Sequence, residues 1–171
     1  MKEQNIQKLK RIKGLIIEGV LPIAGQTEWD DCTTVLSNSG ADLIDSIEES
    51  RKKIHDIRIA LFFPLSRDSM IDMDTAYHEL LQDYELFFDV SMRFLKTIID
   101  GDRCTDQQHN KKQYIRELLD HSRKAIDYIT NLVSKKSTEY MHCQTLFVAL
   151  VATIMAFSSV LISLWALLGR S

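Results

Sequence analysis

The chain has 171 residues, of which 26% are charged, and its formal net charge at pH 7 is −3. General nucleic-acid binders carry a basic surface, so this acidic balance argues against a nucleic-acid partner. Six glycines and two prolines are few for this length, and such a composition favours helices. The three cysteines are far apart and form no Cys-x-x-Cys pair, so we expect neither a metal site nor a cofactor.

The first half of the chain shows apolar residues at helical spacing in two stretches. A helix is predicted over about residues 2–18, ended by Gly19 and Pro22. Residues 25–40 are rich in Ser, Thr, Asp and Gly, which predicts mainly loop. A second helix is predicted over about residues 41–62.

The second half of the chain carries two more amphipathic stretches. Pro64 should stop the second helix, with a turn at residues 66–69 before a third helix over about residues 72–100. Gly101 fits a C-terminal glycine cap for that third helix. Thr105 and Gln108 resemble a capping box that opens a fourth helix reaching about Ser134.

Four helices with one apolar stripe each can bury those stripes only against one another. The predicted fold is therefore all-α, an antiparallel bundle of about four helices in residues 1–134. No Gly or Pro lies between Ser134 and the following apolar stretch. The fourth helix can therefore continue as one rod or break near residues 134–138, and the sequence leaves both possibilities open.

The sequence TLFVALVATIMAFSSVLISLWALL, residues 145–168, holds 24 residues and no charge. About 20 apolar residues at about 1.5 Å each suffice to cross a hydrocarbon layer of about 30 Å. We therefore predict a transmembrane helix at residues 145–168, after a juxtamembrane segment at 135–144 and before a short tail at 169–171. Membrane lipid is then the first expected partner.

Residues at the two ends of this span predict its orientation. Basic residues stay on the cytoplasmic side and aromatic rings favour the membrane interface. The expected interface residues are Lys135, Lys136 and Tyr140 just before the span, Trp165 near its far end, and Arg170 after it. The bundle should therefore be cytoplasmic.

A possible signal peptide at residues 8–25 is interrupted by Glu18 and Pro22, so we expect no cleaved signal. The layout resembles a single-pass, tail-anchored protein. Its membrane would be the bacterial inner membrane or, in a eukaryote, the endoplasmic reticulum or the mitochondrial outer membrane.

Small residues follow one line along the predicted span. Steps of four and three residues from its first position reach only small side chains, whereas only Thr153 and Ser158 are small among the other seventeen span residues. A 3.5-residue repeat is the contact line of a left-handed helix pair, and small side chains allow helices to approach closely in lipid. The hydroxyl groups on this line can also hydrogen-bond across it. We call this line the seam and expect homo-oligomers to form through it: Thr145, Ala149, Ala152, Ala156, Ser159, Ser163 and Ala166.

Two short motifs in the fourth predicted helix resemble catalytic families. RELLDH, residues 116–121, resembles the R-x4-6-H signature of HEPN ribonucleases, which are dimeric helical bundles. The resemblance implies a phosphate contact for Arg116 and an acid–base role for His121. HSRKA, residues 121–125, resembles the H-x-x-K-G core of histidine phosphotransfer domains, with Ala125 in place of the glycine.

We therefore carry two functional hypotheses from the sequence. The first is a non-enzymatic membrane protein whose cytoplasmic helical bundle binds or regulates an unidentified protein partner and whose span self-associates. The alternative is a membrane-tethered HEPN-like ribonuclease that uses Arg116 and His121. A small pore-former is a third and weaker idea.

Overall fold

The computed structural model describes the backbone of residues 1–21, 26–57, 63–99 and 106–169. This part of the chain holds four α-helices: α1 Glu3–Ile17, α2 Gln26–Asp56, α3 Phe63–Ile99 and α4 Asp106–Leu168. No strand is present among these residues. The prediction of an all-α protein with about four helices and one long apolar helix at the C-terminal end is therefore confirmed.

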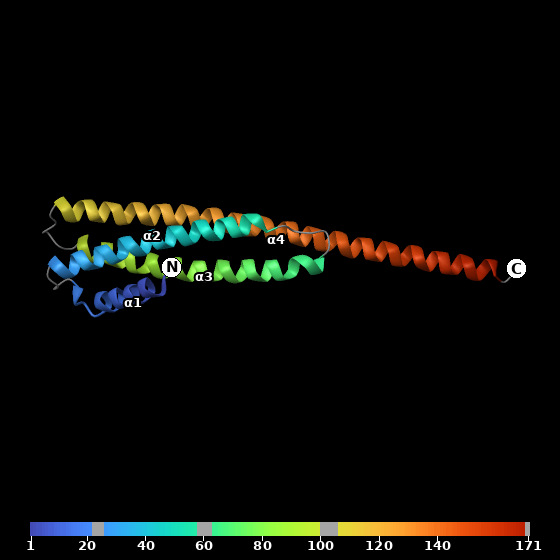
Figure 1. The fold of residues 1–171 in the computed structure, drawn as a ribbon, viewed down its shortest axis with the longest axis horizontal. Coiled ribbons are helices and arrows are strands. Elements are labelled where there is room, and N and C mark those ends of the chain that lie inside the picture. The colour runs from blue at the N-terminus through green and yellow to red at the C-terminus, as the bar shows by residue number, and fades with distance from the viewer. Residues whose placement is uncertain (22–25, 58–62, 100–105, 170–171) are drawn as a thin grey trace.

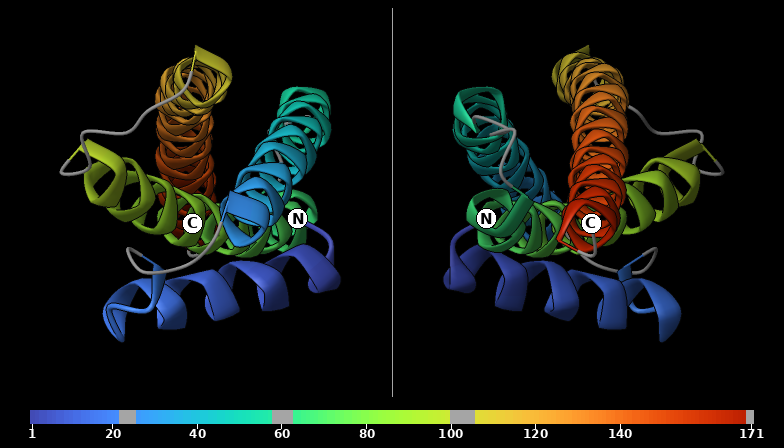
Figure 2. Two further views of the ribbon diagram at one scale, coloured as in Figure 1. Left: turned by 90° about the vertical axis from the view of Figure 1, so that its left-hand side faces the viewer. Right: turned by 90° about the vertical axis from the view of Figure 1, so that its right-hand side faces the viewer.

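The three long helices lie side by side, and α1 lies across them. Figure 1 shows α3 running in the direction opposite to α2 and α4, and it shows α4 continuing far past the other helices. Figure 2 looks along the long axis and shows α1 lengthwise on one side of this body, opposite α4. α1 packs on both α2 and α3, so it covers the side of the body that α4 does not occupy.

One apolar core joins the four helices. Its largest fully buried side chains are Phe87 and Phe94 of α3. The Trp29 ring of α2 packs on Phe94 with 5.1 Å between ring centroids, and α1 contributes Leu9. On α4 the fully buried positions end at Ile129. Leu132 and Val133 still pack against the core, and the part of α4 beyond them lies outside it.

The end of α1 agrees with the sequence prediction. Gly19 adopts a positive φ of 68°, a left-handed conformation that glycine reaches without steric cost. Its N–H donates to the Ile16 carbonyl at 3.2 Å, and the Val20 N–H donates to the Leu15 carbonyl at 3.1 Å. This pair of bonds is a Schellman motif. Gly19 thus ends the first helix as predicted, whereas Pro22 lies outside the described residues.

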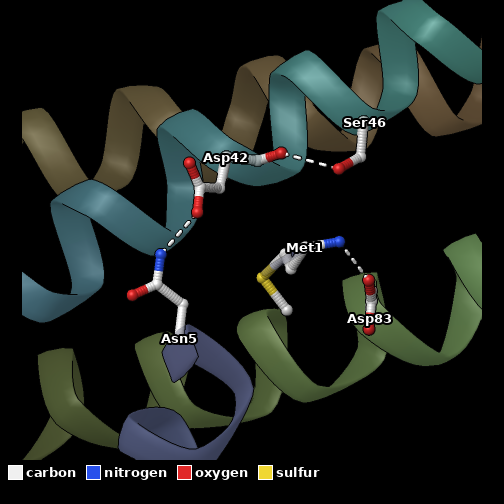
Figure 3. Close-up of polar contacts among 5 residues, drawn as sticks. All are labelled: Met1, Asn5, Asp42, Ser46 and Asp83. Atoms are coloured by element: carbon white, nitrogen blue, oxygen red, sulfur yellow. Dashed lines mark hydrogen bonds and ion pairs between the residues drawn. The ribbon is translucent and has the colours of Figure 1, made fainter. Parts of the chain in front are cut away.

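Polar contacts hold the N-terminal end of α1 on α2 and α3 (Figure 3). The Asn5 amide donates to the Asp42 carboxylate at 2.5 Å, and the Met1 ammonium group contacts the Asp83 carboxylate at 2.5 Å. The Asp42 carbonyl accepts the Ser46 hydroxyl at 2.8 Å. The first two contacts therefore tie the N-terminal end of α1 to α2 and α3.

The start of α2 corrects one prediction. Residues 26–40 are helical, so the expectation of mainly loop over residues 25–40 is wrong for this part. Cys32 and Leu36 are buried and extend the apolar stripe of α2 by about three turns before Leu43. The hydroxyls of Thr33 and Thr34 donate to the Asp30 carbonyl at 2.9 and 2.8 Å. These two hydroxyls are therefore satisfied within the helix, whereas the buried Ser39 hydroxyl has no hydrogen-bond partner among the described residues.

Gly40 lies in α2 for a packing reason. A Cβ atom built on Gly40 would lie 2.9 Å from Leu118 Cδ1 and 2.9 Å from Phe87 Cζ. Such distances are shorter than ordinary van der Waals contact, so α2 approaches α3 and α4 closely at this point because a side chain is missing. The glycine contributes close packing, not a turn.

The start of α3 and the length of α4 differ from expectation as well. α3 begins at Phe63, so the turn at residues 66–69 and the start near residue 72 are wrong. Pro64 falls in the first turn, where the missing N–H would have no helical partner. α4 is one continuous helix, which decides against a break at residues 134–138. The predicted caps at Gly101 and Thr105 lie outside the described residues.

Gly14 of α1 and Gly40 of α2 allow a comparative test of this packing. Gly40→Val should lower the free energy of unfolding by about 1–3 kcal/mol, because the new side chain overpacks the contact with Phe87 and Leu118. A Cβ atom built on Gly14 would meet no other atom within 4 Å. Gly14→Ala should therefore raise stability by about 0.5–1 kcal/mol through helix propensity alone. Thermal or urea unfolding measures both changes, and equal effects at the two sites would contradict the close approach.

The Asp89 carboxylate of α3 makes stability depend on pH. Lys13 of α1 contacts Asp89 Oδ2 at 2.8 Å, and Arg93 donates to Oδ1 at 2.6 Å. These hydrogen bonds, that of Lys13 first, lower the pKa of Asp89 below its ordinary value. A lowered pKa in the folded state stabilises the protein above the unfolded-state pKa of about 3.9, and this gain is lost as pH falls through the folded-state pKa.

Asp89→Asn should therefore lower the melting temperature at pH 7, and the difference from the parent protein should close at about pH 2. Thermal unfolding followed by circular dichroism across this pH range measures the effect. Glu49→Gln is the control, because the Glu49–Lys53 pair is exposed and lies within one helix. A pH-independent difference for Asp89→Asn would contradict this account.

Candidate functional site

The distal half of α4 is an exposed apolar rod. Every residue from Val148 to Gly169 is exposed to solvent, and the Trp165 side chain is 82% exposed. Among the described residues, α4 is the one helix long and apolar enough to cross a membrane. Soluble monomers rarely expose an apolar patch of more than a few hundred Å². This rod is therefore the candidate functional element of the molecule.

No linker separates the rod from the bundle. The Lys136 ammonium group donates to the Ile57 carbonyl at the end of α2 with a distance of 2.8 Å. Beyond it, Tyr140, Cys143 and Phe147 are each partly buried. One side of α4 is thus covered by the rest of the protein as far as the first residues of the predicted span.

The seam lies on the other side of α4. Thr145 and Ala149 are each two residues from Phe147, which places them about 160° around the helix from this covered side chain. Thr145, Ala149 and Ala152 are exposed, as are the remaining seam residues further along. A second helix can therefore approach the seam without meeting α1, α2 or α3.

The hydroxyl groups of the seam already have partners in their own helix. Thr145 donates to the Met141 carbonyl at 2.9 Å, Ser159 to the Met155 carbonyl at 3.0 Å, and Ser163 to the Ser159 carbonyl at 2.8 Å. These donors are satisfied without a second helix, and their oxygens keep free acceptor capacity. These three seam hydroxyls therefore do not need a second helix as a hydrogen-bond acceptor.

The expected interface residues occupy both ends of the rod. Lys135 is exposed, while Lys136 and Tyr140 lie partly against the bundle. Trp165 is in the last turn of α4, and Arg170 lies outside the described residues. The basic pair thus sits where the bundle meets the rod.

The residues of the ribonuclease alternative do not come together in one copy. Arg116 and His121 are both exposed on α4. They are five residues apart on a continuous helix, so their side chains leave the axis about 140° apart. The two side chains therefore do not point to one position from this helix.

The cysteines and acidic residues form no further site in the described part of the chain. No group of three or more His, Cys, Asp or Glu side chains there is arranged to hold a metal ion. Cys32 is buried in the core, and burial, followed by the nearby Asp31 charge, raises the pKa of its thiol. Cys32 is therefore a poor nucleophile.

No family model, curated protein or solved structure matches this chain. Its function is therefore argued from its own geometry.

Proposed function

We propose that this chain is a single-pass membrane protein that holds a helical bundle at the cytoplasmic surface and self-associates through the seam of α4. One observation carries the proposal. A single uninterrupted helix contributes Ile115 and Ile129 to the core at one end and is uncharged and uncovered at the other.

The bilayer covers the apolar side chains in this half of α4, which the bundle leaves exposed to water. Each large apolar side chain gains about 1.5–3 kcal/mol when it is removed from water. The exposed side chains here include Met155, Phe157 and Ile162, which are 69%, 69% and 68% exposed. A helix also satisfies its own backbone hydrogen bonds, which hydrocarbon requires. Residues 145–168 span about 36 Å, enough to cross with some tilt.

The orientation follows from the basic pair. Lys135 and Lys136 lie on the bundle side of the span, and short basic segments stay on the cytoplasmic side during insertion. The bundle is therefore cytoplasmic in this proposal. Its formal charge agrees with a protein-binding role, because all 24 acidic and 20 of the 21 basic residues precede residue 145 and give that part a net charge of −4.

The absence of a linker gives the anchor a second role. Since α4 passes from the core into the span without a break, the position of the seam fixes the direction in which each bundle points. Confinement to a membrane and pairing through the seam also raise the effective concentration of the bundles. Such a protein presents a paired helical surface to a cytoplasmic protein partner.

Charged substitutions within the span test the anchor. Ile154→Lys combined with Leu161→Lys should release the full-length protein into the supernatant after alkaline carbonate extraction, because each central charge costs about 2.5–3.5 kcal/mol on insertion. The matched control, Ile154→Val with Leu161→Ile, should stay in the membrane pellet. Release of the unsubstituted protein by carbonate would contradict the proposal.

Size changes on the two sides of α4 test the seam. Ala152→Leu with Ser159→Leu should abolish self-association in membranes, because the larger side chains keep the helices apart. Ser159→Ala removes the hydroxyl but keeps the small size, so association should weaken by no more than about threefold. Leu150→Ile with Phe157→Leu changes the other side and should have little effect. Energy transfer between labelled copies in vesicles measures all three, and equal losses on both sides would disprove a seam.

A further inference from the structure

We infer that the first turn of α3, residues 63–66, is a second membrane contact and lies in the headgroup layer of the bilayer beside α4. The inference rests on the proposed function, because the span of α4 sets the level of the bilayer. The occupant of this surface is phospholipid of the same membrane. The bundle then sits directly on the bilayer and does not stand clear of it on the rod.

The contacts between α3 and α4 determine the level that α3 reaches. The two helices run in opposite directions (Figure 1), and the Tyr77 hydroxyl of α3 lies 2.9 Å from the Thr130 hydroxyl of α4. Along the helix axes, Tyr77 is about 21 Å from Phe63, and Thr130 is about 22 Å from Thr145. The start of α3 therefore lies within about one turn of the first residue of the span.

Partly buried side chains of α4 agree with this level. They share one side of the helix and are Tyr140, Cys143, Gln144 and Phe147. The end of α2 lies further back, because the Ile57 carbonyl accepts Lys136, which is about 16 Å before Phe147 along α4. Figure 1 shows the start of α3 reaching further along α4 than the end of α2 does. Among the described helices, α3 is therefore the one that reaches the level of these side chains.

Charged residues stop at the same level in both helices. In α4 the last one before the span is Glu139, and residues 140–147 contain no Asp, Glu, Lys or Arg. In α3 the charges begin at Arg67 and Asp68, after a first turn that reads Phe-Pro-Leu-Ser. By the register given above, Asp68 lies at the level of Glu139. Two helices of opposite direction thus lose their charges at one common boundary, as expected where both leave bulk water.

The length and composition of this turn fit the headgroup layer. The hydrocarbon core is about 30 Å thick and the whole bilayer about 40–45 Å, so each headgroup layer measures about 5–8 Å. One helical turn advances about 5.4 Å. Apolar residues such as Phe63 and Leu65 are favoured at the boundary between headgroups and acyl chains. Pro64 removes a first-turn N–H that has no partner in the helix.

The end of α2 has the opposite composition. Its last six residues, 51–56, read Arg-Lys-Lys-Ile-His-Asp, and Arg51, Lys53 and Asp56 are exposed. The helix end that stops short of the span is therefore charged, whereas the end that reaches the span is apolar. Composition thus follows the distance from the span, which favours lipid over a soluble protein as the occupant.

Spin labels on the full-length chain in phosphatidylcholine vesicles test the inference. Cys104→Ser and Cys143→Ser provide the background, and Cys32 stays because it is buried. The labels are attached to single cysteines in the first turn of α3. Their collision rates are measured with oxygen, which concentrates in lipid, and with a nickel chelate, which stays in water.

Three positions are labelled in turn, Phe63→Cys, Leu65→Cys and Ser66→Cys, because they are spread around the helix axis. Ser66→Cys changes the fewest atoms, so the test does not depend on the two larger replacements. Ile71→Cys is the matched control on α3, since Ile71 is 53% exposed and lies about 9 Å further from the span than Leu65. Met155→Cys, at a position that is 69% exposed, reports the span itself.

We expect at least one label in the turn to collide with oxygen, relative to the nickel chelate, more than Ile71→Cys does and less than Met155→Cys does. If all three match Ile71→Cys while Met155→Cys lies in lipid, this inference is overturned and the proposed function stands. Low collision rates with both reagents at all three positions indicate protein around the turn and overturn it as well. A label at Met155→Cys that is exposed to water overturns both the inference and the proposed function.

Discussion

The continuous hydrogen-bonded backbone of α4 is the constraint on which the rest of the molecule depends. Each residue advances a helix by about 1.5 Å and turns it by about 100°. A helix fixed in the core at Ile115 and Ile129 therefore has every later side-chain direction fixed as well. The seam and the bundle are therefore parts of one continuous geometry. A flexible linker at residues 135–144 would have separated them into an anchor and an independent domain.

The core must hold the first half of α4 firmly for this constraint to act. Close packing at Gly40 brings α2 against both Phe87 and Leu118, and the Lys111–Asp30 ion pair joins the N-terminal parts of α4 and α2 at 2.7 Å. At the other end of α2, the Ile57 carbonyl accepts the Lys136 ammonium group. α4 is thus attached at both ends of its bundle segment as well as through its apolar stripe.

The sequence predicted the features that depend on long, uniform patterns. The long apolar helix at the C-terminal end and the end of α1 at Gly19 require only hydrophobicity and one conformational rule. The prediction from sequence was wrong where one residue type occurs both in loops and in helices. Gly40 and the Ser and Thr residues near it resemble a loop, but the missing side chain serves helix packing. Pro64 resembles a stop, but it lies in the first turn of α3. The partial burial of Phe147 depends on tertiary contacts, which no local pattern contains, whereas the separation of Arg116 from His121 follows from their five-residue spacing on a helix.

Lipid and water place different demands on the two halves of α4. In the bilayer, helices gain nothing from hiding apolar surface, so close approach of small residues such as Ala152 and Ser159 would have to drive the proposed association. In water, exposed polar residues of α4 such as Lys124, Asn131 and Thr138 provide little driving force, because their groups are already well hydrated. In the proposed pair, the affinity would therefore come from the seam and not from the polar half of α4.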